Sequence, residues 1–455
     1  ILLDSGLFQG RREDFYRINT SFPFPISEVN GLVLSHAHID HSGNIPTLVK
    51  NGFKSPIYTT HPTVDLCGLM LPDSGHIQEE DIKFVNKINR RKGLPLRQPL
   101  YTENDAYQAL SSFRGVNYHQ PITLTDDMTV TFYDAGHVLG SAISVLDIQN
   151  DGNGATGKIR LVYAVDLGRN DLPLLKNPEF VNDIDYLIIE GNYGNRQHEP
   201  VQTAKGKLTE VVNRTIKRGG KIIIPSFAFE RTQEVVYFLN ELVREKKIPK
   251  VPIIVDSPLA TNITAVFQRN IHYLDEKTRN LMSKNMDPFG FNLVQYIRSR
   301  EESQRLNNDR RPMIIISASG MCEAGRILHH LKNNIENPAN TILVVGYMAQ
   351  NTLGKKIVER QPVVKIFGEE YELRAEVVKI NAFSAHAGRD ELIGYIKKCG
   401  NSLKPRPFDS RLKGRDKRIF VVHGDDEQTK PLVQQLNDFG YQAHLPERNE
   451  EVVIG

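Results

Sequence analysis

His36-Ala37-His38-Ile39-Asp40-His41 comes just after the apolar segment Gly31-Leu32-Val33-Leu34 and places four candidate metal ligands within six positions. Imidazole nitrogen is a common zinc ligand, and carboxylate oxygen completes catalytic sites that keep one position open for water. Six residues of one tight turn cannot all point at a single ion. We therefore expect the first two histidines to face one cation and the Asp40-His41 pair to face a second. The stretch predicts a two-metal hydrolytic centre rather than a solvated histidine-rich loop.

The 455 residues are 40% hydrophobic and 24% charged, with a formal net charge of +3. A chain of this length is expected to form two or three domains, each large enough for its own core. The near-neutral balance gives no global signature of nucleic-acid binding, so a polyanion would have to be held by a local groove.

Cysteine usage and hydropathy indicate the cellular setting. The three cysteines, Cys67, Cys322 and Cys399, are scattered and form no Cys-x-x-Cys pair, so we expect buried thiols rather than a disulfide framework. No apolar run is long enough for a transmembrane helix and no signal peptide is evident, which favours a cytoplasmic protein without membrane contact. Ile1-Leu2-Leu3-Asp4 reads as the middle of a strand, so we expect a further segment upstream.

Short apolar runs alternate with helix-like stretches along the chain, which is typical of an α/β protein. Between about 200 and 256 a helix, a strand, a second helix and a second strand follow in order, which predicts a second domain with its own core. The strand expected at Glu376–Ile380 then leads back to histidine-bearing loops. The predicted domains are residues 1–198, 199–372 and 373–455, the first and third being parts of one domain.

Two segments are strongly basic. Residues 402–418 carry seven lysines and arginines among prolines and glycines, which is consistent with a solvated insertion or with a contact to a polyanionic substrate. Residues 63–92 are helical and polar in pattern, and they end in the basic run Lys87-Ile88-Asn89-Arg90-Arg91-Lys92.

Further ligand-type residues follow strand-like segments. His137 is flanked by glycines that let the backbone approach a metal, and we expect it to be the third ligand of the first ion, although a lone histidine is more often structural. Asp166 ends an apolar run and is the best-placed carboxylate to bridge two cations. His423 closes another run and would complete the second ion. Asp4 is expected to fix a ligand histidine by a hydrogen bond, or else to form a plain turn.

Two more residues have the character of an acid–base pair. Glu190 terminates Tyr186-Leu187-Ile188-Ile189, and His386 lies in Phe383-Ser384-Ala385-His386-Ala387-Gly388. A strand-end glutamate beside a histidine could hold the imidazolium form, ready to protonate a leaving alkoxide.

The same residues lie in longer segments that resemble a known family. The His36–His41 stretch with Ser42-Gly43 resembles the signature of the metallo-β-lactamase fold, and Glu190, His386 and His423 resemble motifs A, B and C of its β-CASP branch. That branch includes the polyadenylation-factor endonuclease, its bacterial and archaeal relatives, and ribonuclease J. Other matching segments are His76-Ile77-Gln78-Glu79-Glu80, Pro225-Ser226-Phe227-Ala228, Arg231-Thr232-Gln233-Glu234, Ser317-Ala318-Ser319-Gly320-Met321, Asn192-Tyr193-Gly194-Asn195-Arg196 and Val345-Gly346-Tyr347.

The resemblance implies a four-layered αββα metallo-β-lactamase fold with an inserted Rossmann-like α/β β-CASP cap domain. It implies one zinc on His36, His38 and His137, a second on Asp40, His41 and His423, and Asp166 between them. Glu190 and His386 match the pair that protonates the leaving group. A glycine-rich hairpin is expected before Asp4 and is not present in the sequence. Homodimerisation is a further expectation of the resemblance.

The residue of motif C separates substrates within the branch, since RNA-acting members resemble this chain in having histidine there and DNA-acting members have an apolar residue. His423 therefore favours RNA. The chain departs from the pattern at Gly388, where aspartate is common, at Val165, where glycine is common, and at Gly191-Asn192, where Ser-Thr is usual. None of these departures removes an expected ligand.

The expected reaction is hydrolysis of single-stranded RNA at two Zn²⁺ ions, with Asp40, Glu190 and His386 in catalytic roles and 5′-phosphate and 3′-hydroxyl products. The cleavage is expected to be endonucleolytic, with a 5′-exonuclease activity left open. A DNA nuclease of the same fold, a small-molecule metallo-hydrolase and a non-catalytic scaffold are the alternatives. Hydroxyls and arginine forks suit backbone phosphates, and the candidates for such contacts are Ser226, Arg231, Ser319, Arg326 and Ser384.

Overall fold

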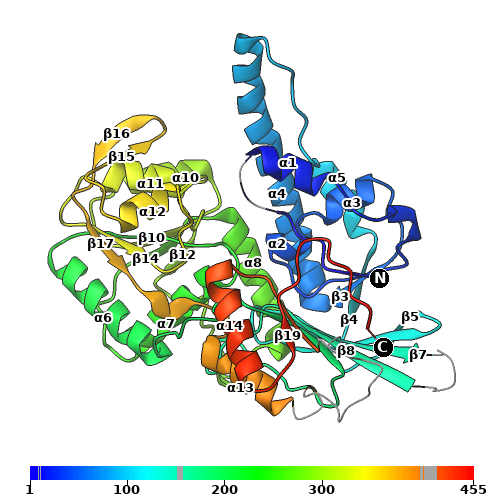
Figure 1. The fold of residues 1–455 in the computed structure, drawn as a ribbon. Helices are drawn as coiled ribbons and strands as arrows, with labels where there is room; N and C mark the ends of the chain where they lie inside the picture. The colour runs from blue at the N-terminus through cyan, green and yellow to red at the C-terminus, as the bar shows by residue number, and fades with distance from the viewer. Residues whose placement is uncertain (9, 11, 151–156, 400–402, 404–417, 455) are drawn as a thin grey trace. The chain divides into compact units, whose positions relative to one another are not determined.

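The computed structural model describes residues 1–8, 10, 12–150, 157–399, 403 and 418–454 (Figure 1). Most of the basic segment expected at 402–418 lies outside the described residues. The chain divides into two compact units, one of residues 1–170, 177–197 and 385–455, the other of residues 171–176 and 198–384. Each unit is described by itself.

The described residues of the first unit form two β-sheets. The smaller sheet is parallel, in the order β1-β2-β3-β4, with strands β1 (Leu2–Leu3), β2 (Leu32–Val33), β3 (Ile57–Thr60) and β4 (Phe113–Val116). The larger sheet has the order β19-β18-β9-β8-β7-β6-β5 and changes from antiparallel to parallel pairing at β8. Its strands are β5 (Ile122–Thr125), β6 (Met128–Asp134), β7 (Ala142–Asn150), β8 (Gly157–Ala164), β9 (Tyr186–Glu190), β18 (Ile419–Val422) and β19 (Ala443–His444).

The two sheets share an apolar core between them. Val33 and Val116 of the smaller sheet pack with Val130, Phe132 and Leu146 of the larger one. Helices α13 (Arg389–Lys398) and α14 (Asp426–Asp438) bury their apolar sides in a second core with β8, β9 and β18. On the smaller sheet, α4 (His61–Lys92) contacts β3 and β4. The layers are therefore helix, sheet, sheet and helix, as the resemblance implies.

Helix α4 is the longest element of this unit. Thr60 caps its first turn, Gly93 ends it in the left-handed conformation with φ 64°, and Pro72 lies inside it. Its first half is buried beside α5 (Glu103–Leu110), and its second half is largely exposed. The shorter helices of the unit are α1 (Arg12–Asn19), η1 (Ile26–Glu28), α2 (Ile39–Ser42) and α3 (Ile45–Lys50).

The second unit is built on a six-stranded parallel sheet in the order β12-β11-β13-β10-β14-β17. Its strands are β10 (Ile222–Pro225), β11 (Ile253–Val255), β12 (Val294–Tyr296), β13 (Ile314–Ser317), β14 (Thr341–Val344) and β17 (Glu376–Lys379). Strands β10, β11, β13 and β14 are buried along their whole length, as parallel strands with both faces covered must be. The other elements are α6 (Val201–Lys217), α7 (Arg231–Arg244), α8 (Pro258–Arg269), η2 (Ile271–Tyr273), α9 (Glu276–Ser283), α10 (Arg300–Asn308), α11 (Ile327–Asn334), α12 (Leu353–Val358), the hairpin β15 (Val363–Ile366) and β16 (Glu369–Glu372), and η3 (Asn381–Phe383).

Strand β17 lies in the sheet of the second unit. It pairs in parallel with β14, from Thr341↔Glu376 to Val344↔Lys379, whereas the sequence predicted it at the start of the returning part of the first domain, from residue 373. Strand β17 is thus the edge strand of the six-stranded sheet of the second unit. The chain returns to the first unit between Ser384 and Ala385.

Two sequence expectations about apolar and sulfur chemistry can be compared with the structure. All three cysteines are buried free thiols, as expected. Among the described residues, no helix combines the length and the apolar character needed to cross a bilayer.

Candidate metal centre and acid–base pair

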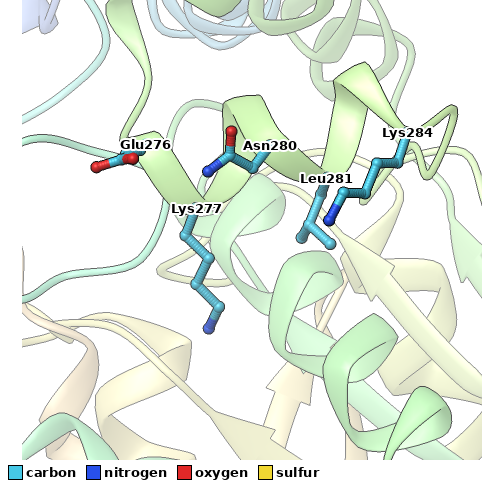
Figure 2. A pocket seen from close by; sticks show the side chains of 5 residues that line it. All are labelled: Glu276, Lys277, Asn280, Leu281 and Lys284. Atoms are coloured by element: carbon cyan, nitrogen blue, oxygen red, sulfur yellow. The ribbon is translucent and has the colours of Figure 1, made fainter.

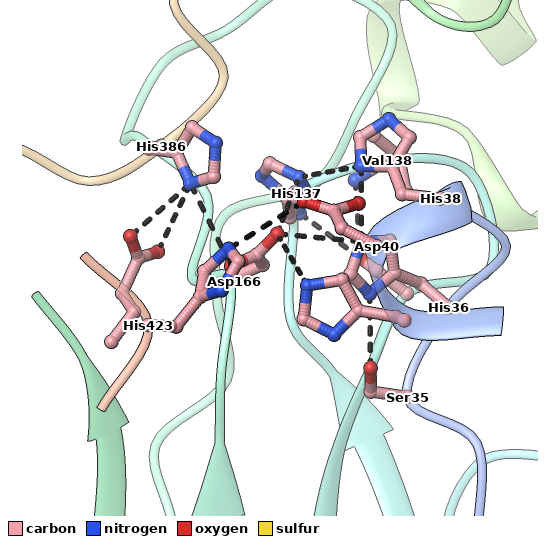
Figure 3. Close-up of polar contacts among 12 residues, drawn as sticks. Ser35, His36, His38, Asp40, His137, Val138, Asp166, His386 and His423 are labelled. Carbon is pink, nitrogen blue, oxygen red and sulfur yellow. Dashed lines mark hydrogen bonds and ion pairs between the residues drawn. The ribbon is translucent and has the colours of Figure 1, made fainter. Parts of the chain in front are cut away.

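The candidate ligands of the first unit meet at loops that follow its strands. His36 and His38 lie in the loop after β2, and Asp40 and His41 lie in the short helix α2. Figure 3 shows the side chains of His36, His38 and Asp40 converging with those of His137, Asp166, His386 and His423. Sequence positions almost 390 residues apart, from 36 to 423, thus meet at one place because their strands belong to the same two packed sheets.

Three residues of this site depart from ordinary backbone geometry. Asp4, Asp166 and His423 have positive φ angles of 62°, 52° and 50°, each just after a strand. The left-handed conformation is costly for residues with a Cβ atom, by about 1 kcal/mol or more, and persists where surrounding contacts enforce it. It turns each side chain out of the strand direction and toward the neighbouring loops.

The first donor set consists of three histidines and one carboxylate. His38 Nδ1 lies 3.0 Å from His36 Nε2 and 3.4 Å from His137 Nε2. Asp166 Oδ2 lies 3.4 Å from His36 Nε2 and 3.5 Å from His137 Nε2. A tetrahedron with metal–ligand bonds of 2.0–2.1 Å has edges of about 3.3 Å. The donor atoms therefore have the mutual spacing that a zinc-sized cation requires.

Burial keeps the first set in its metal-binding form. Desolvation, with help from neighbouring histidines, lowers the pKa of His36 and His137 and lowers the pKa of His38 to about 3. These imidazoles are accordingly neutral near pH 7, which is the state that binds a metal through a nitrogen lone pair.

The second donor set consists of Asp40, His41 and His423. The Asp40 Oδ2 and His423 Nε2 atoms are 3.7 Å apart, and one ligand atom from each of the three residues lies within 4.8 Å of the others. Asp166 reaches this set as well, since Oδ2 lies 3.3 Å from His41 Nε2 and Oδ1 lies 3.3 Å from His423 Nε2. Within the described part of the chain, His41 Nε2 and Asp166 Oδ1 are buried without a hydrogen-bond partner. Each of these atoms instead lies 3.3 Å from another candidate ligand atom, His41 Nε2 from Asp166 Oδ2 and Asp166 Oδ1 from His423 Nε2, which fits a cation between the atoms of each pair.

Asp4 contacts the second donor set through the ring nitrogen of His41 that points away from Asp166. Its carboxylate accepts hydrogen bonds from the Ser35 backbone N–H and hydroxyl, both at 2.7 Å, and from the Tyr163 hydroxyl at 2.9 Å. The Asp4 Oδ2 atom also lies 2.7 Å from His41 Nδ1, which directs His41 Nε2 toward Asp166. Burial lowers the pKa of His41, but the charges of Asp166 and Asp4 outweigh burial and hold that pKa well above its usual value. Asp4 therefore orients a ligand-type histidine and offers it a proton acceptor.

Glu190 and His386 form a pair beside Asp166. His386 Nδ1 lies 3.1 Å from Glu190 Oε2 and 3.8 Å from Asp166 Oδ1. Glu190 is fully buried, and a backbone bridge to Gly168 fixes His386. Burial lowers the pKa of His386, but the charge of Glu190 outweighs it and raises the pKa to about 9. The pair therefore favours the imidazolium form of His386, whose Nδ1 faces the Glu190 carboxylate.

Two residues of this site were not found by sequence reasoning. Ser35 and Tyr163 hold Asp4, and the Ser35 hydroxyl also lies 3.0 Å from His36 Nδ1. The sequence feature that could have pointed to Tyr163 is its position three residues before the candidate ligand Asp166. Its partner is 159 positions away in sequence, so no local pattern joins the two.

The five candidate phosphate contacts do not all present free side chains. Ser226 is 1% exposed, and its hydroxyl donates to the Phe227 carbonyl and accepts from Thr232 in the first turn of α7. Ser226 is therefore not available for the expected contact in this arrangement. Ser319 is partly exposed, and its hydroxyl accepts from two backbone N–H groups within its own turn. Ser384 is partly exposed after η3.

The two candidate arginines have carboxylate partners inside the second unit. Arg231 donates to Glu234 at 2.5 Å and lies over the Phe383 ring. Arg326 donates to the buried Asp256 at 2.6 Å and to a backbone carbonyl at 2.7 Å. These carboxylates neutralise the charge of both guanidinium groups. A structural role within the second unit therefore accounts for both arginines, and no contact to a phosphate is needed to explain them.

A cavity of about 470 Å³ lies along α9 in the second unit (Figure 2). It is lined by Glu276, Lys277, Asn280, Leu281 and Lys284. None of the candidate residues above contributes to it.

Comparison with known proteins gives matches along the chain. A metallo-beta-lactamase superfamily domain profile matches residues 1–182, a Beta-Casp domain profile matches residues 232–357, and a Zn-dependent metallo-hydrolase RNA specificity domain profile matches residues 370–446. The chain is 33% identical over 454 residues to the ribonuclease TTHA0252 of Thermus thermophilus, which covers 100% of this chain and 94% of that protein.

Two archaeal relatives extend the comparison. The chain is 33% identical over 404 residues to the RNase J-like protein of Methanocaldococcus jannaschii, covering 88% of this chain and 83% of that protein. It is 30% identical over 448 residues to the transcription termination factor FttA of Methanosarcina mazei, covering 96% of this chain and 65% of that protein.

Proposed function

Because the chain belongs to the β-CASP branch of the metallo-β-lactamase-fold nucleases, we propose that it is a zinc-dependent ribonuclease that hydrolyses single-stranded RNA. Membership of this family establishes the general activity, which is that of a metal-dependent nuclease. The choices of zinc, of the single-stranded form and of a two-metal mechanism are the proposal.

The observation that supports it most strongly is the position of Asp166 between two donor sets. Its Oδ2 faces the set of His36, His38 and His137, and both its oxygens reach the set of Asp40, His41 and His423. Histidine nitrogens with a few carboxylate oxygens are the donors that zinc prefers, whereas magnesium and calcium prefer oxygen alone. The donor set thus fits two zinc ions with a shared carboxylate.

The two donor sets would hold the cations, and bound cations would supply polarisation of a phosphoryl oxygen and easier ionisation of a water molecule near neutral pH. The chain's own residues do the rest. Asp4 holds His41 in its orientation, and Asp166 keeps the two sets together. Glu190 holds His386 Nδ1, which leaves the Nε2–H of the imidazolium to protonate the departing 3′ oxygen. The water oxygen bonds to phosphorus as the bond from phosphorus to the 3′ oxygen breaks, and the proton lost by the water passes to solvent. The products are a 5′-phosphate and a 3′-hydroxyl, and His386 then takes up a proton from solvent.

RNA is favoured over DNA by two observations. The RNA specificity profile covers residues 370–446, a range that contains both His386 and His423. Two similar proteins are named as a ribonuclease and an RNase J-like protein. Homodimerisation and a cytoplasmic location stay predictions, and sedimentation of the purified chain would test the first of them.

The decisive experiment is digestion of end-labelled substrates by the purified protein with zinc. Single-stranded RNA, single-stranded DNA of the same sequence and a thioester are offered side by side. We expect cleavage of the RNA alone, and the lengths of labelled products report internal cuts or trimming from the 5′ end. Preferential cleavage of DNA or of the thioester would replace this proposal by the corresponding alternative.

A further inference from the structure

The second half of α4 and the chain that returns from it form an ordered projection, residues 77–97, which we call the α4 arm. In Figure 1 this arm extends in blue beyond the rest of α4. Two asparagines join its two sides: Asn86 exchanges hydrogen bonds of 2.8–2.9 Å with the backbone of Arg97, and Asn89 donates to the Pro95 carbonyl at 2.8 Å. The returning segment is thereby fixed against the helix.

The charge of the arm is almost entirely positive. Residues 82–102 contain six lysines and arginines and no aspartate or glutamate. Lys83 pairs with Glu80 at 2.6 Å. Among the described residues, no carboxylate pairs with Lys87, Arg90, Arg91 or Lys92, and all four are exposed.

The charge at the end of a helix has an ordinary explanation, since the C-terminal dipole favours cations in the last turn. That explanation does not account for the apolar side chains on the same arm. Phe84 is 67% exposed, and Leu94 and Leu96 are each 52% exposed. Ile77, Phe84 and Ile88 recur at the spacing of one helix face, and all three are exposed. A face kept only for solubility would not carry them.

We propose that the α4 arm binds the substrate strand away from the cleavage centre, with the basic residues on phosphates and Phe84 stacked on a base. Positive side chains interleaved with an exposed aromatic ring are the combination that holds single-stranded nucleic acid without sequence preference. A symmetric contact between two copies through this arm would bring like charges together, which disfavours self-association here. This inference rests on the proposed function, because it takes RNA as the polyanion.

The length of α4 sets the reach of the arm. At the start of α4, the Thr60 and Thr63 hydroxyls donate to the Gly140 carbonyl at 2.6 and 2.9 Å, in the loop that carries His137. From there to Lys87 the helix rises about 40 Å at 1.5 Å per residue. A stacked strand needs about twelve nucleotides to cover that distance at 3.4 Å each. A long RNA can touch both places, and a very short one cannot.

The absence of tryptophan from the sequence allows a direct test. In Phe84→Trp the new indole is the only one in the protein, and base stacking should quench its fluorescence as a 30-nucleotide RNA is added. Phe367→Trp, at a ring that is 55% exposed in the second unit, is the matched control and should not be quenched to the same extent. This readout does not depend on cleavage, so it can fail while the proposed function stands, or the reverse.

Charge removal gives the second measurement. The variant with Lys87→Gln, Arg90→Gln, Arg91→Gln and Lys92→Gln should bind the 30-nucleotide RNA about tenfold or more weakly, with a salt dependence of log Kd that is shallower by up to about 3. Its KM for the long RNA should rise while kcat stays unchanged, and its kinetics on a five-nucleotide RNA should match those of the unmutated protein. The charge-conserving set Lys87→Arg, Arg90→Lys, Arg91→Lys and Lys92→Arg should retain binding.

Unchanged long-RNA affinity in the charge-removal variant, or the same loss with the five-nucleotide substrate, would overturn the inference. So would a change in sedimentation on Phe84→Ala with RNA affinity preserved, because the arm would then be a contact between copies of the chain. If no RNA is cleaved but Phe84→Trp is quenched, the binding arm stands and the proposed activity fails.

Discussion

Asp166 is the residue at which the two donor sets meet. It is 1% exposed and has the backbone conformation that asparagine and aspartate tolerate better than most residues. Burial raises the pKa of Asp166, but the charges of His41, His386 and His423 outweigh it and hold the pKa well below its usual value. A carboxylate that stays ionised in such a buried position is suited to share its oxygens between cations.

Replacing His386 by alanine tests the acid–base pair. We expect His386→Ala to retain two zinc ions per chain and to lose about 10²- to 10⁴-fold in kcat, which is the usual contribution of a general acid. His423→Ala should instead lower the zinc content toward one ion per chain. Zinc analysis and single-turnover cleavage separate the two variants. The control is His119→Ala, at an exposed histidine outside the site, which should retain full activity. Cleavage by His386→Ala at the unmutated rate would remove His386 from the mechanism.

A second buried carboxylate, Asp256, tests the stability of the other unit. His330 Nε2, Ser303 Oγ and Arg326 Nη1 lie 2.5–2.6 Å from its oxygens. Burial raises the pKa of Asp256, but these three partners outweigh burial and lower it. Because the folded pKa lies below the unfolded one, the network stabilises the fold above about pH 4 and loses this effect as the pH falls through the folded pKa.

Asp256→Asn should therefore destabilise the second unit by about 3 kcal/mol or more at pH 7, because it leaves buried partners unmatched. Melting temperatures measured from pH 7 down to pH 3 should show the difference from the unmutated protein shrinking below about pH 4. Glu301→Gln, at an exposed position of α10, should give no difference at any pH. A pH-independent difference for Asp256→Asn would show that charge is not its cause.

At the scale of elements, the site depends on how closely the loops after strands approach one another. Gly168 lies two residues after Asp166, donates its N–H to the Ala135 carbonyl at 2.8 Å and forms a backbone bridge to His386. A Cβ atom added to Gly168 would lie 1.9 Å from the Gly136 carbonyl oxygen, beside His137. The backbone at position 168 must therefore be glycine for three site-bearing loops to touch.

Gly168→Ala should lower the melting temperature by several degrees and reduce the zinc content, although no ligand-type residue is altered, because the clash is with backbone that cannot rotate away. Gly206→Ala is the control: it lies in the middle of α6 with open space around it, and alanine should be neutral or stabilising there. Normal zinc content in a folded Gly168→Ala protein would mean that the loops adapt.

At the scale of the whole molecule, every residue of the candidate metal centre belongs to the first unit, although that unit is assembled from three separate stretches of chain. Cations bound there would hold residues 1–170, 177–197 and 385–455 together. A ligand present at 1,000 times its Kd stabilises the fold it binds by about 4 kcal/mol.

Metal removal should therefore act on one unit. In a calorimetric scan, a chelator should lower the transition of the first unit, and added zinc should restore it. The transition that is sensitive to Asp256→Asn should not move. If the chelator instead shifts only that transition, or shifts none at any zinc concentration, the candidate centre does not hold structural zinc.

The sequence was most informative where the chemistry is local or repeated along the chain. The His36–His41 stretch, the strand-end positions of Asp166 and His423, and the alternation of strands and helices after residue 200 are visible without a structure. Strands β5 to β7 of the first unit were not identified, because polar residues interrupt their apolar runs: threonines in β5 and β6, and the Asp147, Gln149 and Asn150 end of β7.

The sequence alone determined the kinds of donor atom, their order along the chain and the family that they resemble, because ligand chemistry depends on residue type. Only the tertiary structure decided which donors face each other, that β17 stays with the second unit, that Tyr163 and Ser35 hold Asp4, and that Ser226 and Arg326 turn inward. Apart from the local bonds of Ser226, most of these outcomes depend on contacts between residues more than 30 positions apart. Packing, rather than any local pattern, selects such contacts, since each is stable only when the whole sheet around it has formed.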